Sequence, residues 1–386
     1  MDFAFSAEQL DIFGAVDELC SEVFAPNAEA VDDAKAWPAE NVQLMADSDL
    51  MGIPVPEEHG GMGLGFLDWA VIGEKLSAAC TTTGAVFGAH MLCVYPLMLF
   101  ANDDQRKKYL TPLAKGEHVG AFGLTEPNAG SDAGNVQTRA EKVGDEYILN
   151  GSKVFITNAG EAQTYIVIAN LNPDTGTRGL TAFIVEKGFE GFEFGKNEQK
   201  MAYGSLPNRE LIFNDCRVPA ENVLYKPRGG FRVALQTLDV GRIGMAIGAV
   251  GVAQAAFDKA LAYSQTRVQF DKPICEFQQV QKMIADMAVE LQAGRWLTYD
   301  AAWRKDQGLD FEKEAAMAKL YTSEMAGRVT DHAVQIHGGY GYCKEYTVER
   351  YFREAKLFEI VEGTSEIQRL VIANKVLKEA IKAAKK

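Results

Sequence analysis

The hydrophobic pattern of this chain changes its period twice, and that change limits the folds that it can adopt. Up to about residue 120, and again from about residue 231, apolar residues recur at the spacing of amphipathic helices. Between these regions, short runs of β-branched and aromatic residues alternate with turn residues, which is typical of strands. This order predicts an α+β multidomain protein with a helical N-terminal domain at 1–120, a middle β-sandwich or barrel domain at 121–230 and a C-terminal helical bundle at 231–386.

The first helical region opens on a capping box and contains one long apolar stretch. Ser6 and Gln9 have the spacing at which each side chain satisfies the other's backbone amide. Residues 84–101 are nearly all apolar and barely reach the length that spans a bilayer. His90 and Pro96 lie inside this stretch, and we expect a buried helix rather than a membrane span.

The middle region carries a hairpin signal. Asn150-Gly151 separates the β-forming runs 146–149 and 153–156, and both positions of such a turn favour positive φ. In the last region, long amphipathic runs predict the helices of a bundle, at 242–267, 277–305 and 311–337. No GxGxxG motif follows a predicted strand, which argues against a Rossmann fold.

Charge and cysteine usage limit the partners. The chain has 39 Lys plus Arg against 53 Asp plus Glu, a net charge of −14, which argues against nucleic acid or an anionic membrane as the main partner. The six cysteines show neither CxxC spacing nor zinc-ligand spacing with histidine. We therefore expect reduced thiols, no metal site and a reducing compartment. The start, Met1-Asp2-Phe3, lacks a presequence, from which we expect a cytoplasmic protein.

Residues 121–134 are the first informative motif. Alone, this segment is a loop with small residues, hydroxyls and exposed amides that suits a polar ring or a phosphate, or else an ordinary turn region. As a whole, it closely resembles the flavin-binding signature of acyl-CoA dehydrogenases. The resemblance covers essentially the entire chain, through segments at 155–159, 267–273, 277–278, 284–287, 335–341, 348–350, 353–356 and 362–369.

The resemblance implies a fold, a cofactor and partners. The family has a helical N-terminal domain, a middle β domain and a C-terminal four-helix bundle, and it is usually a homotetramer with FAD at a subunit interface. Its members remove two hydrogens from the Cα–Cβ bond of an acyl-CoA, as in β-oxidation, and pass electrons to an electron-transfer flavoprotein. No side chain accepts a hydride, so this chemistry requires such a cofactor.

Glu362 is the candidate base for the α-proton. By itself, a glutamate before Gly363 and a predicted capping box, Ser365 to Gln368, is usually a solvated residue or part of a helix start. The resemblance places the family's base at this position. Some members carry the base just before the arginine matched by Arg242, where this chain has Gly241. A carboxylate buried beside an acyl chain should have a raised pKa.

The predicted flavin contacts fall into three groups that the resemblance assigns. One group lies on the middle domain, one would reach FAD from a neighbouring subunit, and one would contact adenosine diphosphate at a helix N-terminus. Phe155 stands where many relatives carry Trp, and Phe155 or Thr157 alone could be β-core packing. The groups are Phe122, Leu124, Thr125, Ser131, Phe155 and Thr157; Arg267, Phe270, Gln278, Gln335 and Gly339; and Thr364 and Glu366.

The predicted acyl-CoA contacts define a substrate hypothesis. Asp239 and Arg242 resemble a pair on the CoA side of the pocket, although this i, i+3 spacing also suits an ion pair on a helix surface. Val361 replaces a common Tyr and Met91 replaces a common Ser, which favours a short, branched or alicyclic acyl group. Thr81, Thr82 and Thr83 stand where an Arg would bind a distal carboxylate, so a glutaryl-type substrate is disfavoured. Ser131 and Gly363 complete the predicted substrate contacts.

Three alternatives remain open. An acyl-CoA oxidase shares the fold, but such chains are commonly much longer than 386 residues. A catalytically silent subunit that binds FAD and CoA would have no need of Glu362. A helical scaffold without a ligand would leave the motifs unexplained.

Overall fold

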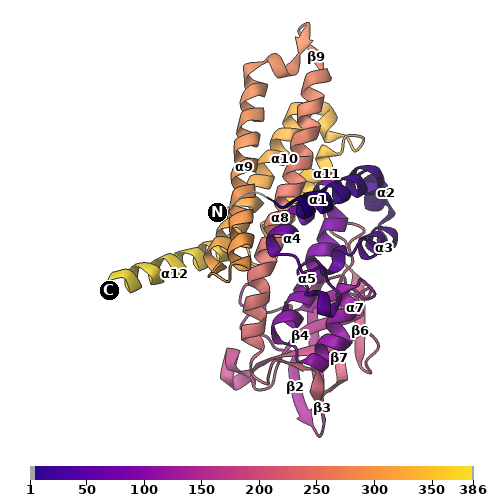
Figure 1. Ribbon diagram of the computed structural model, residues 1–386, viewed down its shortest axis with the longest axis vertical. Helices are drawn as coiled ribbons and strands as arrows, with labels where there is room; N and C mark the ends of the chain where they lie inside the picture. Colours follow the sequence, from indigo (N-terminus) through magenta and orange to yellow (C-terminus); the bar gives the residue numbers. More distant parts are fainter. Residues whose placement is uncertain (1–4, 385–386) are drawn as a thin grey trace.

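The computed structural model describes residues 5–384 and has the predicted α+β architecture. Helices form one side and the upper part of the molecule, and the strands gather at the lower end (Figure 1). The capping box at Ser6 and Gln9 is present, since each side chain accepts from the other residue's backbone amide. The N-terminal helices are α1 (Ala7–Leu19), α2 (Ala25–Ala34), α3 (Ala39–Asp47), α4 (Phe66–Ala79), α5 (Thr81–Phe100), α6 (Asp103–Gln105) and α7 (Thr111–Ala114).

The middle region forms one eight-stranded sheet. Its strands follow the order β6-β7-β3-β2-β4-β5-β8, and β1 pairs with β4 in parallel off this path. Both faces of β4 and nearly all of β5 are buried, so the core lies at this side of the sheet. The strands are β1 (Gly120–Gly123), β2 (Arg139–Val143), β3 (Glu146–Thr157), β4 (Thr164–Asn170), β5 (Leu180–Glu186), β6 (Phe192–Asn197), β7 (Asn208–Pro219) and β8 (Val223–Leu224).

The predicted hairpin at Asn150-Gly151 is wrong. Strand β3 runs straight through both residues, and its register against β7 shifts between Leu149 and Gly151, as at a β-bulge. The Asn150 amide instead pairs with Asp215 on β7, donating to its carboxylate at 3.0 Å and accepting from its backbone N–H at 2.9 Å. The hairpin turn that β3 does make lies at Gly144 and Asp145, between β2 and β3.

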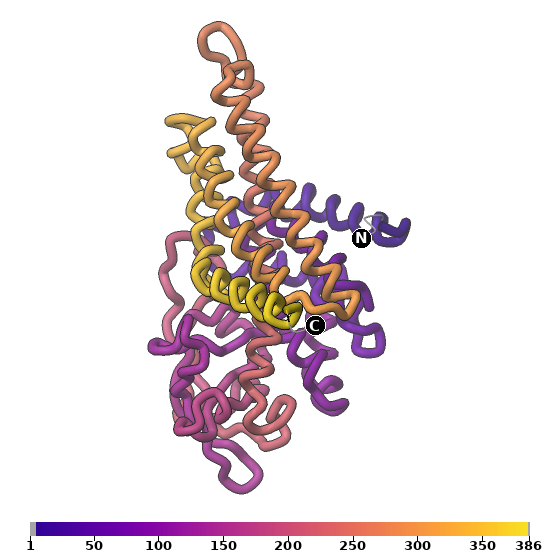
Figure 2. The backbone as a smooth tube through the Cα atoms, turned by 90° about the vertical axis from the view of Figure 1, so that its left-hand side faces the viewer, coloured from indigo at the N-terminus to yellow at the C-terminus, as the bar shows by residue number. Residues whose placement is uncertain are grey.

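The C-terminal region is built around three long helices that run side by side (Figures 1 and 2). A short turn, β9 to β10, joins the first two at the far end of the bundle, and α12 projects away from the body (Figure 1). The elements are α8 (Gly230–Thr266), β9 (Val268–Gln269), β10 (Lys272–Pro273), α9 (Gln278–Asp306), α10 (Glu312–His337), α11 (Val348–Phe358) and α12 (Ser365–Ala384).

Two described helices, α5 and α8, are long and apolar enough to cross a bilayer. In the fold, 67% of an apolar 18-residue stretch of α5 and 72% of the corresponding stretch of α8 are buried inside the protein. The apolar stretch at 84–101 therefore forms most of a core helix, with Pro96 inside it. Helix α5 packs against α8 and β1, and so links the helical layer to the sheet.

Candidate active site

Glu362 lies on the short loop between α11 and α12, in a backbone conformation that aims its side chain inward. Its φ is 53° and that of Gly363 is 93°. A non-glycine residue with positive φ is strained and persists only where its surroundings hold it. Here Gln368 donates to the carbonyls of Glu362 at 3.3 Å and of Gly363 at 2.9 Å, and the Ser365 N–H donates to Glu359 O at 3.0 Å.

The carboxylate of Glu362 faces Gly241 on α8. A Cβ at position 241 would overlap Glu362 Oε2 and would lie 2.9 Å from Leu92 Cδ2 on α5. The glycine thus makes the space in which the carboxylate sits. Oε2 is inaccessible to solvent and accepts no hydrogen bond from any residue between 5 and 384. A buried carboxylate oxygen with a free lone pair can accept a proton from a bound molecule.

Two cations face this carboxylate. Lys319 on α10 and Arg242 on α8 both lower the pKa of Glu362, but burial outweighs them and raises it to about 7. Such a group is part-ionised near neutral pH, as a general base requires. Arg242 Nη1 also donates to Asp239 at 2.6 Å. Both side chains of that pair are largely buried, so it is not a helix-surface ion pair, and burial raises the pKa of Asp239 to about 6.

The start of α12 differs from the predicted capping box. Ser365 is the first helical residue and its hydroxyl is buried without a partner among the described residues. The cap is Thr364, whose hydroxyl accepts from the Ile367 N–H at 3.4 Å. The Gln368 side chain is used by the Glu362–Gly363 turn instead. Glu366 is exposed on the first turn of α12.

Of the predicted acyl-pocket residues, Val361 is half-buried next to Glu362, and Met91 is 1% exposed within the hydrophobic core. The neighbouring Leu92, which sequence analysis did not single out, reaches Gly241. Thr81 and Thr83 are engaged elsewhere, because Thr81 donates to Glu354 at 2.7 Å and Thr83 accepts from Asn41 at 2.8 Å.

The predicted flavin residues of the middle domain lie on two adjacent segments. The Val154 N–H donates to Thr125 O at 2.9 Å, which joins the end of β3 to the segment after β1. Phe155 is 65% exposed with φ of 60°, at an irregularity in β3. Phe122, Thr125 and Thr157 are half-buried, Leu124 is buried and Ser131 is exposed.

Beneath these segments lies a buried ion pair that sequence analysis missed. Lys153 Nζ donates to Glu126 at 2.6 Å and to Leu124 O at 3.2 Å. Glu126 also accepts from the backbone amides of Gln137 and Thr138, at 2.6 and 2.9 Å. Burial opposes ionisation of Glu126, but Lys153 and these donors outweigh it and lower its pKa. The pair therefore fixes the loop that carries the predicted flavin contacts.

The second group of predicted flavin residues lies apart from Glu362, at the β9 end of the bundle (Figure 1). Arg267 and Gly339 line one cavity there, and the Arg267 guanidinium lies 5.6 Å from the centre of the Tyr340 ring. Phe270 is 89% exposed, and Gln278 and Gln335 are exposed. Within one chain, these residues do not meet the middle-domain group.

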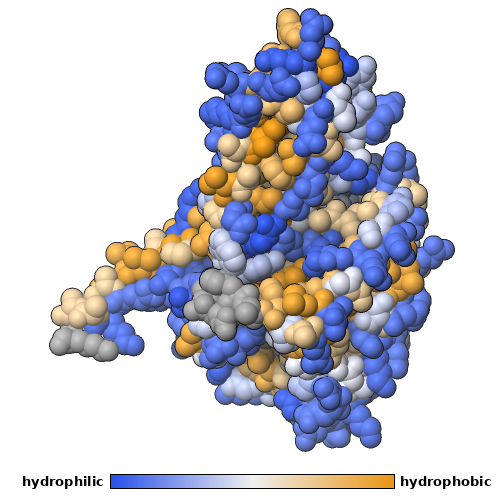
Figure 3. Space-filling view, turned by 45° about the horizontal axis from the view of Figure 1, so that its top comes forward, coloured by the Kyte–Doolittle hydropathy of each residue, from blue (hydrophilic) through white to orange (hydrophobic). Residues whose placement is uncertain are grey.

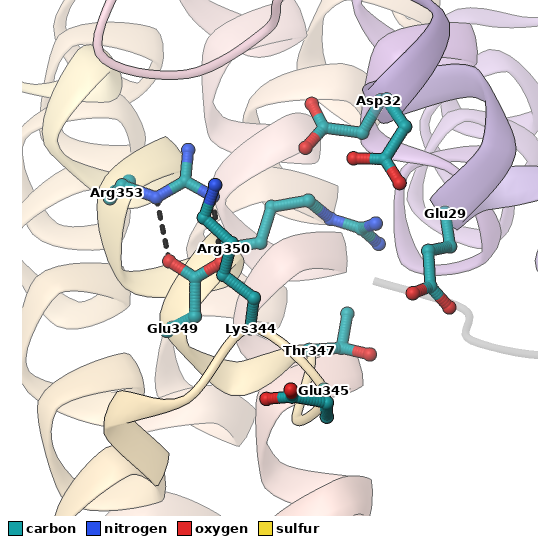
Figure 4. Close-up of a pocket in the computed structure, with 9 residues that line it drawn as sticks. Glu29, Asp32, Lys344, Glu345, Thr347, Glu349, Arg350 and Arg353 are labelled. Carbon is teal, nitrogen blue, oxygen red and sulfur yellow. Dashed lines mark hydrogen bonds and ion pairs between the residues drawn. The ribbon is translucent and has the colours of Figure 1, made fainter.

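A second buried carboxylate lies on α11. Glu354 is fully buried, and burial raises its pKa to about 7 although Arg350 lowers it. It is 3.6 Å from Arg350, which also lines the charged cavity between α2 and α11 in Figure 4. In that cavity Arg353 is paired with Glu349 at 2.7 Å. The cavity includes neither Glu362 nor Gly241.

Comparison with known proteins gives a consistent result. Models of the acyl-CoA dehydrogenase N-terminal, middle and C-terminal domains match residues 6–117, 121–216 and 228–377. A relative from Clostridium acetobutylicum, "Acyl-CoA dehydrogenase, short-chain specific", is 46% identical over 379 residues, which cover 98% of this chain and 100% of the relative.

Two solved structures are equally close in shape, each with a TM-score of 0.96. One is butyryl-CoA dehydrogenase from Megasphaera elsdenii, at 42% identity over 98% of this chain and 100% of that chain. The other is a chain in a structure of the electron transferring flavoprotein of Acidaminococcus fermentans, at 46% identity over 98% of this chain and 100% of that chain.

Proposed function

The chain belongs to the acyl-CoA dehydrogenase family, and from this we propose that it oxidises the Cα–Cβ bond of a short-chain acyl-CoA with Glu362 as the base. The reaction class is FAD-dependent dehydrogenation of an acyl-CoA to the trans-2-enoyl-CoA. The observation that carries the role of Glu362 is its buried, unpartnered Oε2 opposite Gly241.

The residues present fit FAD. Phe155 offers an exposed aromatic side chain on a left-handed backbone, and its neighbour Val154 is hydrogen-bonded to the backbone carbonyl of Thr125. Arg267 and Tyr340 offer a cation and a ring at the β9 end, where an anionic or aromatic part of a cofactor would bind. When bound, FAD supplies the hydride acceptor. The residues that would hold it are Phe122, Leu124, Thr125, Ser131, Phe155, Thr157, Arg267, Phe270, Gln278, Gln335, Gly339, Thr364 and Glu366.

Glu362 removes the α-proton of the thioester. Its pKa of about 7 keeps a large ionised fraction at neutral pH while leaving the carboxylate basic enough to take a weakly acidic proton. Proton removal neutralises Glu362 and leaves negative charge on the substrate, and Arg242 and Lys319 are the nearby cations that can stabilise that charge. Asp239 accepts from Arg242 and so orients its guanidinium.

The proposed acyl group is short. Two of the similar proteins are named for a short acyl group: the Clostridium acetobutylicum relative is short-chain specific, and the Megasphaera elsdenii structure is a butyryl-CoA dehydrogenase. In addition, Leu92 reaches Gly241 beside the base, where it narrows the space for an acyl chain. Thr81 and Thr83 are occupied by buried hydrogen bonds and offer no cation, which disfavours a distal carboxylate.

We further propose a cytoplasmic homotetramer that acts in β-oxidation and delivers electrons to an electron-transfer flavoprotein. Four apolar side chains on α12 support an assembly, because Leu370, Val376, Leu377 and Ile381 are between 45% and 61% exposed. Figure 3 shows apolar surface along this projecting helix. The separation of the two flavin groups supports an FAD site completed by a second copy. The similarity to a chain solved with an electron transferring flavoprotein supports that acceptor.

The test is an anaerobic titration of the purified yellow protein with butyryl-, isobutyryl-, cyclohexanecarboxyl- and palmitoyl-CoA, followed by flavin absorbance. We expect butyryl-CoA to bleach the wild type and to leave Glu362→Gln oxidised. The fastest bleaching with palmitoyl-CoA would overturn the short-chain assignment. Bleaching of the glutamine variant at the wild-type rate would remove Glu362 as the base. Peroxide formation in air would favour an oxidase, and a protein that no acyl-CoA bleaches would favour a silent subunit.

A further inference from the structure

Lys319 is a fully buried lysine whose ammonium reaches the active-site loop. It lies on α10 among alanines, is 0% exposed and donates from Nζ to Gly363 O at 2.7 Å. Burying an ammonium group is costly unless hydrogen bonds and an opposite charge compensate. Lys319 is not part of any motif used above, so its burial at this depth calls for a role.

The hydrogen bond from Lys319 holds the one turn that aims the proposed base. Glu362 and Gly363 both have positive φ, and the carbonyl of Gly363 accepts from Lys319 and from Gln368, at 2.7 and 2.9 Å. Two donors from two different helices, α10 and α12, therefore converge on one carbonyl oxygen. Because the side chain of Glu362 departs from this turn, a shift of the turn would move its carboxylate away from Gly241.

The same ammonium is one of the charges that face the carboxylate. Around Glu362 these are Lys319 from α10 and Arg242 from α8, which is itself paired with Asp239. Lys319 in turn faces Glu362, the nearby carboxylates Glu359 and Glu366, and the like charge of Arg242. Burial lowers the pKa of Lys319 to about 8, and the carboxylates oppose that effect. Near neutral pH the lysine is therefore mostly protonated, and it favours the ionised form of Glu362.

We propose that Lys319 is a positioning residue for the base: it fixes the Glu362–Gly363 turn through the Gly363 carbonyl, and its charge keeps Glu362 ionised for proton removal. This inference rests on the proposed function, since it assumes that Glu362 takes the α-proton. Two consequences follow. Loss of the charge should raise the pKa of Glu362, and loss of the donor should lower turnover even where Glu362 is fully ionised.

The experiment compares Lys319→Met, Lys319→Arg and Lys319→Gln with Lys313→Met and Glu362→Gln, all as FAD-loaded full-length protein. Lys313 is the matched control, because it lies on the same helix but pairs with Glu379 at the surface. The readouts are FAD content, thermal midpoint, kcat and KM for butyryl-CoA across pH, and the infrared band of the protonated carboxyl that is missing in the glutamine variant.

We expect Lys319→Met to move the acid limb of kcat and the infrared titration upward by about one pH unit, which lowers kcat about tenfold on that limb. Its plateau rate at high pH should stay several-fold below that of Lys313→Met, with KM little changed. Lys319→Arg keeps the charge, so the acid limb of its kcat profile should lie at the same pH as in the wild type. If Lys319→Met fails to load FAD, Lys319→Gln is measured in its place and should show the same upward shift.

The inference would be overturned if a folded, FAD-loaded Lys319→Met or Lys319→Gln protein behaved like the wild type. That result would be an unchanged acid limb of kcat, an unchanged infrared titration and an unchanged plateau rate at high pH. If Lys319→Arg also moved the acid limb of kcat to higher pH, the charge of Lys319 would not be what keeps Glu362 ionised. Glu362→Gln separates this failure from failure of the proposed function: if that variant turns over at the wild-type rate, Glu362 is not the base, whatever Lys319 does.

Discussion

Two buried carboxylates, Glu354 and Glu362, lie eight residues apart, and burial raises the pKa of each to about 7. Each has an Oε2 without a hydrogen-bond partner in the part of the chain that the structure describes, and each faces an arginine. Their surroundings differ. Glu354 lies within a regular helix, is fully buried and accepts a hydrogen bond from the Thr81 hydroxyl. Glu362 is on a strained turn, is partly exposed as a whole residue although its Oε2 is buried, and faces a glycine.

The comparison teaches that a shifted pKa does not by itself identify a catalytic group. Burial produces the same shift at both positions. The distinguishing features of Glu362 are the space that Gly241 leaves for its carboxylate, the left-handed backbone and cations on two neighbouring helices. Glu354 has a hydrogen-bonded hydroxyl and a buried arginine, which suit a structural contact between α5 and α11.

The largest expected difference is in chemistry. Glu362→Gln should lower kcat by about 10³-fold, because the amide cannot accept the α-proton. Glu354→Gln should keep kcat within a few-fold of the wild type. Steady-state kinetics with butyryl-CoA, normalised to FAD content, measure both. A comparable loss in the two variants would break the distinction between the two carboxylates.

The glycine opposite Glu362 should be the next most sensitive position. Gly241→Ala places a methyl group against Oε2, and we expect kcat to fall by about ten- to hundredfold as the carboxylate is displaced. Gly248→Ala, on the same helix, is the control, since its Cβ would meet the ring of Phe358 instead. Equal kinetics for both alanine variants would show that the space at Gly241 is dispensable.

Both carboxylates should make the fold less stable as the pH rises, because the folded state raises the pKa of each. The folded pKa of Glu354, about 7, lies above 4.5, the ordinary pKa of a glutamate side chain. Its contribution is therefore fully present below pH 4.5 and is lost as pH rises toward about 7, by up to about 3 kcal/mol. Glu354→Gln should flatten the fall of the thermal midpoint between pH 5 and pH 7. An unchanged slope would mean that Glu354 is ionised throughout this range.

The smallest effect should come from the hydroxyl that binds Glu354. Thr81→Val removes the 2.7 Å hydrogen bond and should destabilise the fold by about 1–2 kcal/mol while leaving kcat unchanged. Urea unfolding and kinetics on the same preparation check both statements. A loss of activity without a loss of stability would connect Glu354 to the chemistry after all.

Sequence patterns predicted the order of helical and strand regions, because periodicity is local and survives without knowledge of partners. They also paired Gly241 with Glu362 through the family resemblance, and the structure places the two in contact. Asn150-Gly151 was misjudged because the cross-strand amide pairing with Asp215, 65 residues away, outweighs the local turn preference. Lys319 and Lys153 could not be found, since their partners lie 44 and 27 residues away. Met91 and Leu92 are neighbours on one helix, and only packing decides which of the two faces the site.

The contact between Gly241 and Glu362 also bears on how such enzymes diversify. The two positions come from different secondary elements, α8 and the loop before α12, yet they border the same small volume. A carboxylate entering from either side would therefore reach the same reacting carbon. The residue identities at these two positions would have to be exchanged and the Leu92 side chain would have to shift, but the backbone could stay as it is. The site thus contains an evolutionary route along which the proton acceptor can change its place in the sequence without changing its place in space.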